Sequence, residues 1–129
     1  MYNFDFSFVR SGAPIVTLSS TGIAFNSVVR NMLGYPSEID IGYDEQSNAI
    51  GICAHNPENT DKPYEFESRE KDGWVRISCR DFIRYLSQKN NMDFTKAIQF
   101  IPKYDTFAKM LIIIVDQTYM KTPKASETE

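Results

Sequence analysis

The sequence predicts an α+β domain that is mainly β and is built from two β-β-α-β-β units. Most apolar residues alternate with polar ones, as in half-buried strands, while two short segments have helical spacing. The same order of segments occurs twice, over about residues 15–53 and 64–115. One unit of about 40 residues cannot bury both faces of its sheet, whereas two units can close one small barrel with two short helices.

Size and composition indicate one globular domain over residues 1–116. The chain has 129 residues, of which 42% are hydrophobic and 24% are charged. Its longest apolar run, Met110–Val115, is far shorter than the ~20 residues of a membrane-spanning helix. Cys53 and Cys79 are too few for a disulfide framework. We therefore expect a cytoplasmic protein without a membrane segment, and a flexible tail over residues 117–129.

The first unit follows an aromatic strand and contains one compact helix. Strands are predicted at residues 2–8, 15–18, 23–25, 39–43 and 50–52. Asn26 suits the N-cap of the helix, because its side chain can accept a hydrogen bond from a free amide of the first turn. Gly34 stands where a C-terminal glycine is favoured, and Pro36 prevents the helix from continuing.

The second unit follows a long loop, residues 54–63, and repeats the order. Its strands are predicted at residues 64–66, 74–77, 97–101 and 110–115, with a turn at residues 103–106. Phe82, Ile83 and Leu86 form the apolar face of its helix, which is expected to end at Asn90. Ser78, with Asp81 three residues later, is similar to a capping box at the start of this helix.

The first unit also carries a recognisable combination of residues. The strand Ile23-Ala24-Phe25 is followed by Arg30-x-x-Leu33-Gly34 and then by the hairpin of residues 39–52. This pattern resembles the AbrB/MazE-like (SpoVT-AbrB) swapped-hairpin family, whose members bind DNA. The resemblance implies a swapped-hairpin barrel, formed within one chain as a pseudo-dimer or between two chains as a homodimer. The first unit departs from the family at Asn26, which replaces a proline, and at Ser20, which replaces a lysine.

Catalytic and metal-binding chemistry is not predicted. Cys53 and His55 could be read as a nucleophile pair or as two zinc ligands, but a zinc site needs three or four ligands and only Cys79 and scattered carboxylates remain, so a strand-end cysteine and a loop histidine are the simpler interpretation. Asp40, Asp44 and Glu45 could be read as a cation site, although turn chemistry explains them more simply. We therefore expect no enzyme activity and no cofactor.

A local excess of positive charge is the main functional lead. Residues 69–89 contain six basic and three acidic side chains, although the whole chain has a net charge of −3. The candidate nucleic-acid-binding residues are Arg69, Lys71, Arg76, Arg80 and Arg84. Arginines on a hairpin and a helix can contact phosphates and guanine edges. The alternative is an ordinary solvated surface in which Glu70, Asp72 and Asp81 pair with these cations.

Two functional hypotheses follow for a non-enzymatic binding module. The first is an AbrB-like DNA-binding regulator, for example of the antitoxin type, whose partner is duplex DNA. The second is a phage or mobile-element accessory protein that acts through a protein partner, for example by inhibiting a host protein. The acidic first half of the chain is compatible with the second hypothesis, since residues 1–63 contain seven acidic and three basic side chains.

Overall fold

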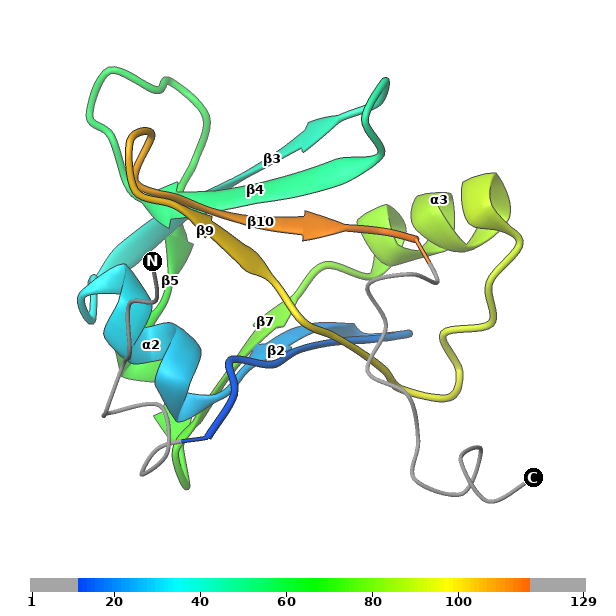
Figure 1. The fold of residues 1–129 in the computed structure, drawn as a ribbon, viewed down its shortest axis with the longest axis horizontal. Coiled ribbons are helices and arrows are strands. Elements are labelled where there is room, and N and C mark those ends of the chain that lie inside the picture. Colours follow the sequence, from blue (N-terminus) through cyan, green and yellow to red (C-terminus); the bar gives the residue numbers. More distant parts are fainter. Residues whose placement is uncertain (1–11, 117–129) are drawn as a thin grey trace, which may run out of the picture.

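The computed structural model describes residues 12–116, so the predicted strand at 2–8 and the predicted tail at 117–129 lie outside the described residues. The fold is α+β and mainly β, with two five-stranded antiparallel sheets, two α-helices and one short 3-10 helix (Figure 1). The two sheets lie on opposite sides of one hydrophobic core. No helix in residues 12–116 combines the length and apolar character needed to span a membrane.

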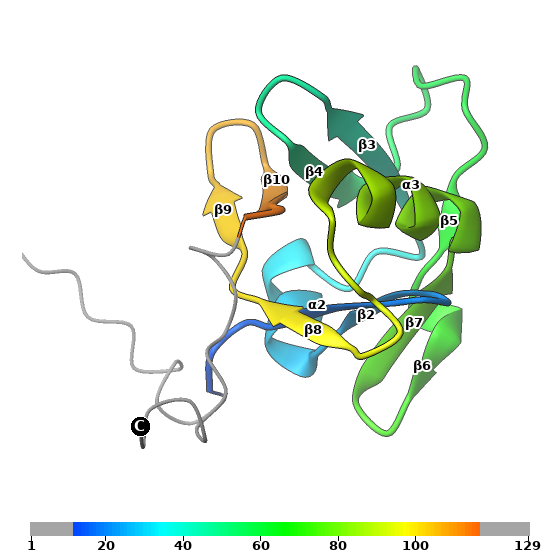
Figure 2. The same cartoon turned by 90° about the vertical axis from the view of Figure 1, so that its right-hand side faces the viewer.

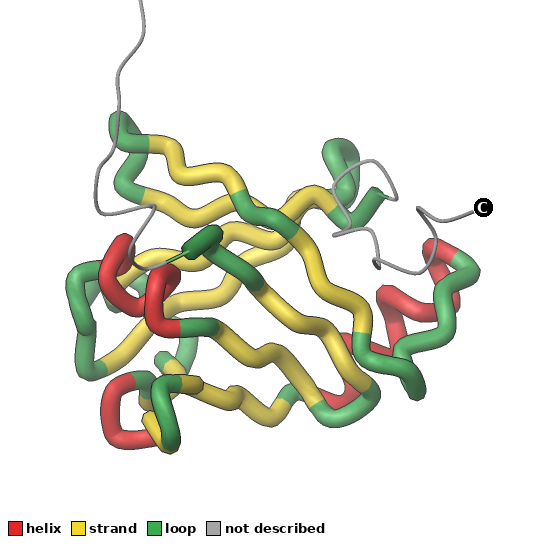
Figure 3. The backbone as a smooth tube through the Cα atoms, turned by 60° about the horizontal axis from the view of Figure 1, so that its bottom comes forward, coloured by secondary structure: helices red, strands yellow, loops and turns green. Residues whose placement is uncertain are grey.

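Each sheet contains strands from both halves of the chain. Sheet A has the order β6-β7-β2-β1-β8, where the strands are β1 (Val16–Ser19), β2 (Gly22–Phe25), β6 (Glu70–Lys71), β7 (Trp74–Ser78) and β8 (Ile98–Phe100). Sheet B has the order β5-β3-β4-β10-β9, where the strands are β3 (Glu38–Asp44), β4 (Ala49–Ala54), β5 (Tyr64–Glu65), β9 (Lys103–Asp105) and β10 (Met110–Ile114). Figure 3 traces the backbone with its strands, helices and loops distinguished by colour.

The first hairpins of the two halves meet in the middle of sheet A. The hairpins β1-β2 and β6-β7 both close through two residues, Ser20-Thr21 and Asp72-Gly73. Between the hairpins, β2 pairs with β7 so that Ile23 faces Ile77 and Phe25 faces Val75. Ala24 lies opposite Arg76 at the centre of this ladder. The two hairpins are therefore related by an approximate two-fold axis through that pair.

The second hairpins meet in sheet B in the same way. Here β4 pairs with β10, so that Ile50 faces Ile113 and Ile52 faces Leu111 around a central pair, Gly51 and Ile112. The two turns are also alike. Asp44 and Asp105 each accept a backbone hydrogen bond from the residue two positions later, and Asn48 and Lys109 both have a φ of 55°.

Apolar side chains from both sheets and both helices fill the interior. Along β1, β2, β4 and β10 the buried side chains alternate, which is the pattern of strands with one face in a core. Helix α2 (Ser27–Leu33) contributes Val29, and helix α3 (Arg80–Asn90) contributes Ile83 and Leu86. The helices lie at opposite ends of the space between the sheets (Figure 1). Phe66 is fully buried and meets Phe25 edge to face, with 5.5 Å between ring centroids.

The sheets are joined at both edges by the chain itself. On one side the chain passes from β8 to β9 through Ile101 and Pro102, and on the other it passes from β5 to β6 through the 3-10 helix η1 (Glu67–Arg69). Figure 2 shows the β8 and β9 edge. No backbone ladder connects β8 with β9 or β5 with β6 among the described strands. A closed barrel, which the sequence predicted, is therefore not seen in these residues.

Local sequence signals had mixed outcomes. The carboxamide oxygen of Asn26 caps α2 by accepting the Val29 amide at 3.1 Å, and Gly34 ends that helix with a φ of 80°, so both predictions are confirmed. The predicted capping box is wrong, because Cys79 takes the N-cap position of α3 and makes no side-chain cap. The predicted turn at residues 103–106 is also misplaced, since Lys103–Asp105 is β9 and the turn follows it.

Gly22 provides a test of the packing between the central hairpins. A Cβ atom at Gly22 would lie 1.9 Å from the carbonyl oxygen of Ile77, whereas one at Gly42 would have no neighbour within 4 Å. We expect Gly22→Ala to lower the free energy of unfolding by about 2–3 kcal/mol, because rigid backbone must move. Gly42→Ala is the matched control and should stay within about 0.5 kcal/mol in urea unfolding. Equal effects of the two substitutions would contradict this packing.

Candidate functional site

The outer face of sheet A brings two of the predicted basic residues together. In β7 the side chains of Val75 and Ile77 are buried, so Trp74 and Arg76 project from the opposite face. Lys71 of β6 lies directly opposite Trp74 in the ladder and shares its face. Lys71 and Arg76 are exposed to solvent. The β6-β7 hairpin therefore presents two cations on either side of an indole ring.

Trp74 also belongs to this surface, although it was not among the site residues that the sequence predicted. The guanidinium carbon of Arg76 lies 5.9 Å from the centroid of its ring, which is within the range of a cation–π contact. Both residues line a hollow of about 330 Å³ on the outer face of sheet A, whose lining also includes the small residues Thr17, Ser19, Ala24 and Ala97. The spacing of Trp74 and Arg76, two residues apart in one strand, was the available sequence signal.

Arg80 and Arg84 lie beside this surface rather than within it. Both belong to the exposed side of α3 and line a second hollow, of about 280 Å³, to which Ser20 also contributes. Thr21 lines the first hollow, so the Ser20-Thr21 turn separates the two. Arg84 forms an exposed ion pair with Asp81 at 3.3 Å, which is readily exchanged for another anion.

Arg69 is the last residue of η1 and directly precedes β6. It lies outside the β6-β7 ladder, which pairs Glu70 with Val75 and Lys71 with Trp74. It is exposed, as are the other four predicted residues. We call the surface formed by Arg69, Lys71, Trp74, Arg76, Arg80 and Arg84 the basic face.

Arg30, the arginine of the family-like motif, is held in an internal ion pair and does not belong to the basic face. Its Nε and Nη2 atoms donate to the two carboxylate oxygens of Glu67 at 3.0 and 2.8 Å. Its guanidinium also lies 5.3 Å from the centroid of the Tyr35 ring. Only 15% of the Arg30 side chain and 28% of the Glu67 side chain are exposed. The ion pair ties α2 to η1 and leaves Arg30 outside the basic face.

Charge is separated between the two sheets. The five strands of sheet A contain one carboxylate, Glu70, and two cations. The five strands of sheet B contain one lysine, Lys103, and five carboxylates, which belong to Glu38, Asp40, Asp44, Glu65 and Asp105. The protein therefore presents a basic surface and an acidic surface on opposite sides of its core.

The side chains that the sequence offers for catalysis or metal binding do not form a reactive group in the structure. His55 Nδ1 lies 2.8 Å from Asp40 Oδ1, and the Asn56 amide donates to the other carboxylate oxygen at 2.9 Å. Burial acts to raise the pKa of Asp40, but the hydrogen bonds from Asn56 and His55 outweigh it and hold this pKa low. Burial raises the pKa of both thiols, that of Cys79 to about 11, which disfavours the reactive thiolate. Among residues 12–116, no three His, Cys, Asp or Glu side chains gather as metal ligands would.

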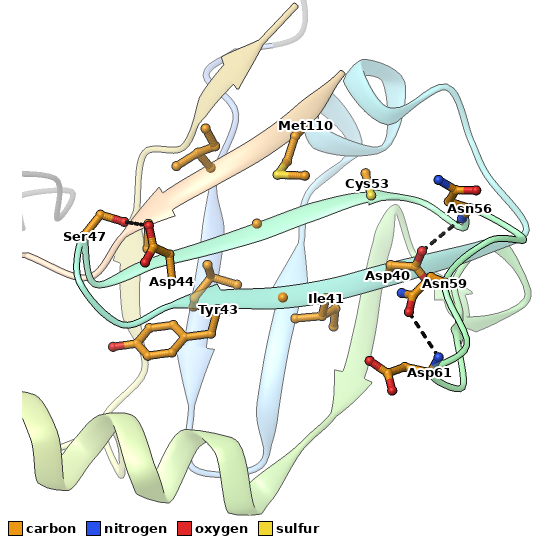
Figure 4. A pocket seen from close by; sticks show the side chains of 15 residues that line it. Asp40, Ile41, Tyr43, Asp44, Ser47, Cys53, Asn56, Asn59, Asp61 and Met110 are labelled. Atoms are coloured by element: carbon orange, nitrogen blue, oxygen red, sulfur yellow. Dashed lines mark hydrogen bonds between the residues drawn. The ribbon is translucent and has the colours of Figure 1, made fainter. Parts of the chain in front are cut away.

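A further hollow lies on the outer face of sheet B and was not predicted. It has a volume of about 580 Å³ and is drawn in Figure 4. Its lining includes Gly42 and Gly51, two glycines at outward positions of adjacent strands, which were the only sequence signal for it. We call this hollow the sheet-B trench.

The ion pair between Arg30 and Glu67 predicts a specific dependence of stability on pH. The hydrogen bond and charge of Arg30 lower the pKa of Glu67 below its ordinary value of 4.5. The stabilisation is therefore complete above pH 4.5 and is lost as the pH falls through the lower, folded-state pKa. We expect Glu67→Gln to cost about 1–2 kcal/mol at pH 7, with a difference from wild type that shrinks below about pH 4 in urea unfolding.

Glu58→Gln is the control for this experiment, because Glu58 is an exposed residue of the 55–63 connection. It should stay within about 0.5 kcal/mol of wild type at both pH values. A difference between Glu67→Gln and wild type that is the same at pH 7 and pH 3 would contradict the ionic character of the contact.

No family model, curated protein or solved structure matches this chain. The resemblance to swapped-hairpin proteins therefore rests on the residues quoted for it.

Proposed function

We propose that this protein is a non-enzymatic DNA-binding protein that contacts duplex DNA with its basic face. The main support is the separation of charge. Within the described strands, the outward positions of β1, β2 and β7 include Thr17, Ala24 and Arg76 and contain no carboxylate. A polyanion that approaches these three strands meets no carboxylate on them, and the carboxylates near the basic face, Asp72, Asp81 and Asp93, belong to the β6-β7 turn and to α3 and its C-terminal connection.

The shape of the basic face suits a duplex. The β6-β7 hairpin is a two-stranded ribbon with Lys71 and Arg76 on one face, and ribbons of this kind fit the major groove of B-DNA. Arg80 and Arg84 lie one helical turn apart on α3 and could contact the phosphates beside the groove. In this arrangement Arg76 is the residue best placed to reach a guanine edge, because it lies nearest the centre of sheet A.

The proposal includes the swapped-hairpin architecture that the sequence resembles. We infer that the chain is an internally duplicated pseudo-dimer in which two β-β-α-β-β units share one barrel-like core. The approximate two-fold pairings of β2 with β7 and of β4 with β10 support this inference. In this pseudo-dimer the two units have diverged, since the second carries the cations while Arg30 of the first forms an internal ion pair.

The test is a titration of duplex DNA at several salt concentrations from about 50 to 200 mM. Neutralising four phosphates predicts a slope of log affinity against log salt of roughly −3.6. Arg76→Ala, Lys71→Ala, Arg80→Ala and Arg84→Ala should each reduce the magnitude of the slope by roughly 0.9. Fluorescence anisotropy of a labelled duplex provides the measurement.

Lys62→Ala is the matched control, because Lys62 is an exposed lysine in the 55–63 connection, away from the basic face. It removes the same charge and should leave the slope unchanged. Absence of binding at the lowest salt would contradict the proposed function. An equal loss of slope in Lys62→Ala and Arg76→Ala would show binding through net charge alone and would contradict the assignment of the basic face.

A further inference from the structure

The sheet-B trench has a floor of bare backbone. Gly42 of β3 and Gly51 of β4 face each other directly in the ladder, so no side chain rises from the outer face at this point. A Cβ atom at Gly51 would lie 2.7 Å from Met110 Sδ, which shows that the flexible Met110 side chain leans over that glycine. Above Gly42 there is no atom within 4 Å of the corresponding position. The trench is therefore open above Gly42 of β3 and partly covered by the Met110 side chain above Gly51 of β4.

The two long sides of the trench differ in chemistry. Along β3 the outward side chains on either side of Gly42 are Asp40 and Asp44, and Asp61 joins them from the 55–63 connection (Figure 4). On the other side, Cys53 of β4 and Met110 and Ile112 of β10 supply an apolar wall. An occupant that fits this surface needs an apolar stripe beside positive charges.

The backbone pairing restricts the conformation of that occupant. Strand β4 is internal to sheet B, because it pairs with β3 on one side and with β10 on the other. Strand β3 pairs with β4 along Ile39–Asp44 but with β5 only at Glu38 and Ile39, so its remaining backbone groups point sideways from the sheet edge and not into the trench. An extended peptide lying over Gly42 and Gly51 would therefore find no backbone partners in the trench floor. An α-helix satisfies its own backbone hydrogen bonds and can lie on such a face.

We propose that the sheet-B trench is the docking site for a basic amphipathic helix of a partner protein. The apolar stripe of the helix contacts Met110 and Ile112, and its lysine or arginine side chains face Asp44 and Asp61. This surface is on the opposite side of the core from the basic face, so both can be occupied at once.

The experiment measures binding of labelled helical peptides of about 18 residues, built from leucine and lysine with one apolar stripe. Matched peptides replace every lysine with glutamate or scramble the same leucine and lysine residues. We expect the basic amphipathic peptide to bind at least about tenfold more tightly than either matched peptide. Equal binding of the basic and acidic peptides, or no binding of the basic peptide, would overturn the proposal.

Two variants locate the binding. Gly42→Leu fills the open part of the trench and should weaken binding about tenfold or more, while Gly42→Ala should change it less than about threefold. The pair Asp44→Asn and Asp61→Asn should weaken it roughly fivefold, with a loss that disappears at high salt. The pair Glu58→Gln and Asp72→Asn removes the same charge outside the trench and should have no effect.

A second readout separates a filled trench from a misfolded variant. In Cys79→Ser protein, bound peptide should slow alkylation of Cys53, which lines the trench, at an alkaline pH. Circular dichroism and urea unfolding check that Gly42→Leu is folded. Unchanged alkylation at saturating peptide would overturn the assignment of the trench. A dimer of the unliganded protein that Gly42→Leu converts to a monomer would instead assign the trench to a second copy of the chain.

Discussion

The structure depends on two antiparallel strand pairings that join the halves of the chain. In sheet A, β2 and β7 bring Ile23 against Ile77 and Phe25 against Val75, and in sheet B the isoleucines of β4 meet Leu111 and Ile113 of β10. All of these side chains are buried. Neither half can cover the apolar face of its own hairpins, so each hairpin is completed by its counterpart from the other half. Loss of either central ladder would expose the whole core.

This arrangement separates the inside of the protein from two independent outer surfaces. Because strand side chains alternate, every residue that packs into the core places its neighbours on an outer face. In sheet A these outward residues are small, polar or basic apart from Trp74, and in sheet B they are mostly glycine, acidic, aliphatic or sulfur-containing residues, together with Lys103. The same core therefore carries the proposed DNA-binding face and the proposed helix-docking trench. A protein with both could link nucleic acid to another protein.

The loss of symmetry between the halves explains why one half carries most of the positive charge. In the first half, Arg30 is held by Glu67 of η1, a segment of the second half that crosses between the sheet edges. In the second half, Arg84 of α3 pairs with the exposed Asp81, and Asp93 lines the hollow beside Arg80 and Arg84. Arginine at similar places in the two helices thus stabilises the fold in one case and remains accessible in the other.

The sequence by itself determined the local structure, because strand alternation, the Asn26 cap and the Gly34 helix end are set by residues close together in the chain. It also indicated the basic residues and the repeated order of elements. Only the tertiary structure decided that Arg30 is an internal ion-pair residue, that Trp74 accompanies Arg76 on an outer face, and that Gly42 and Gly51 meet to form a trench. Each of these depends on which strands become neighbours and in which register, and the register is set by the fit of the whole core.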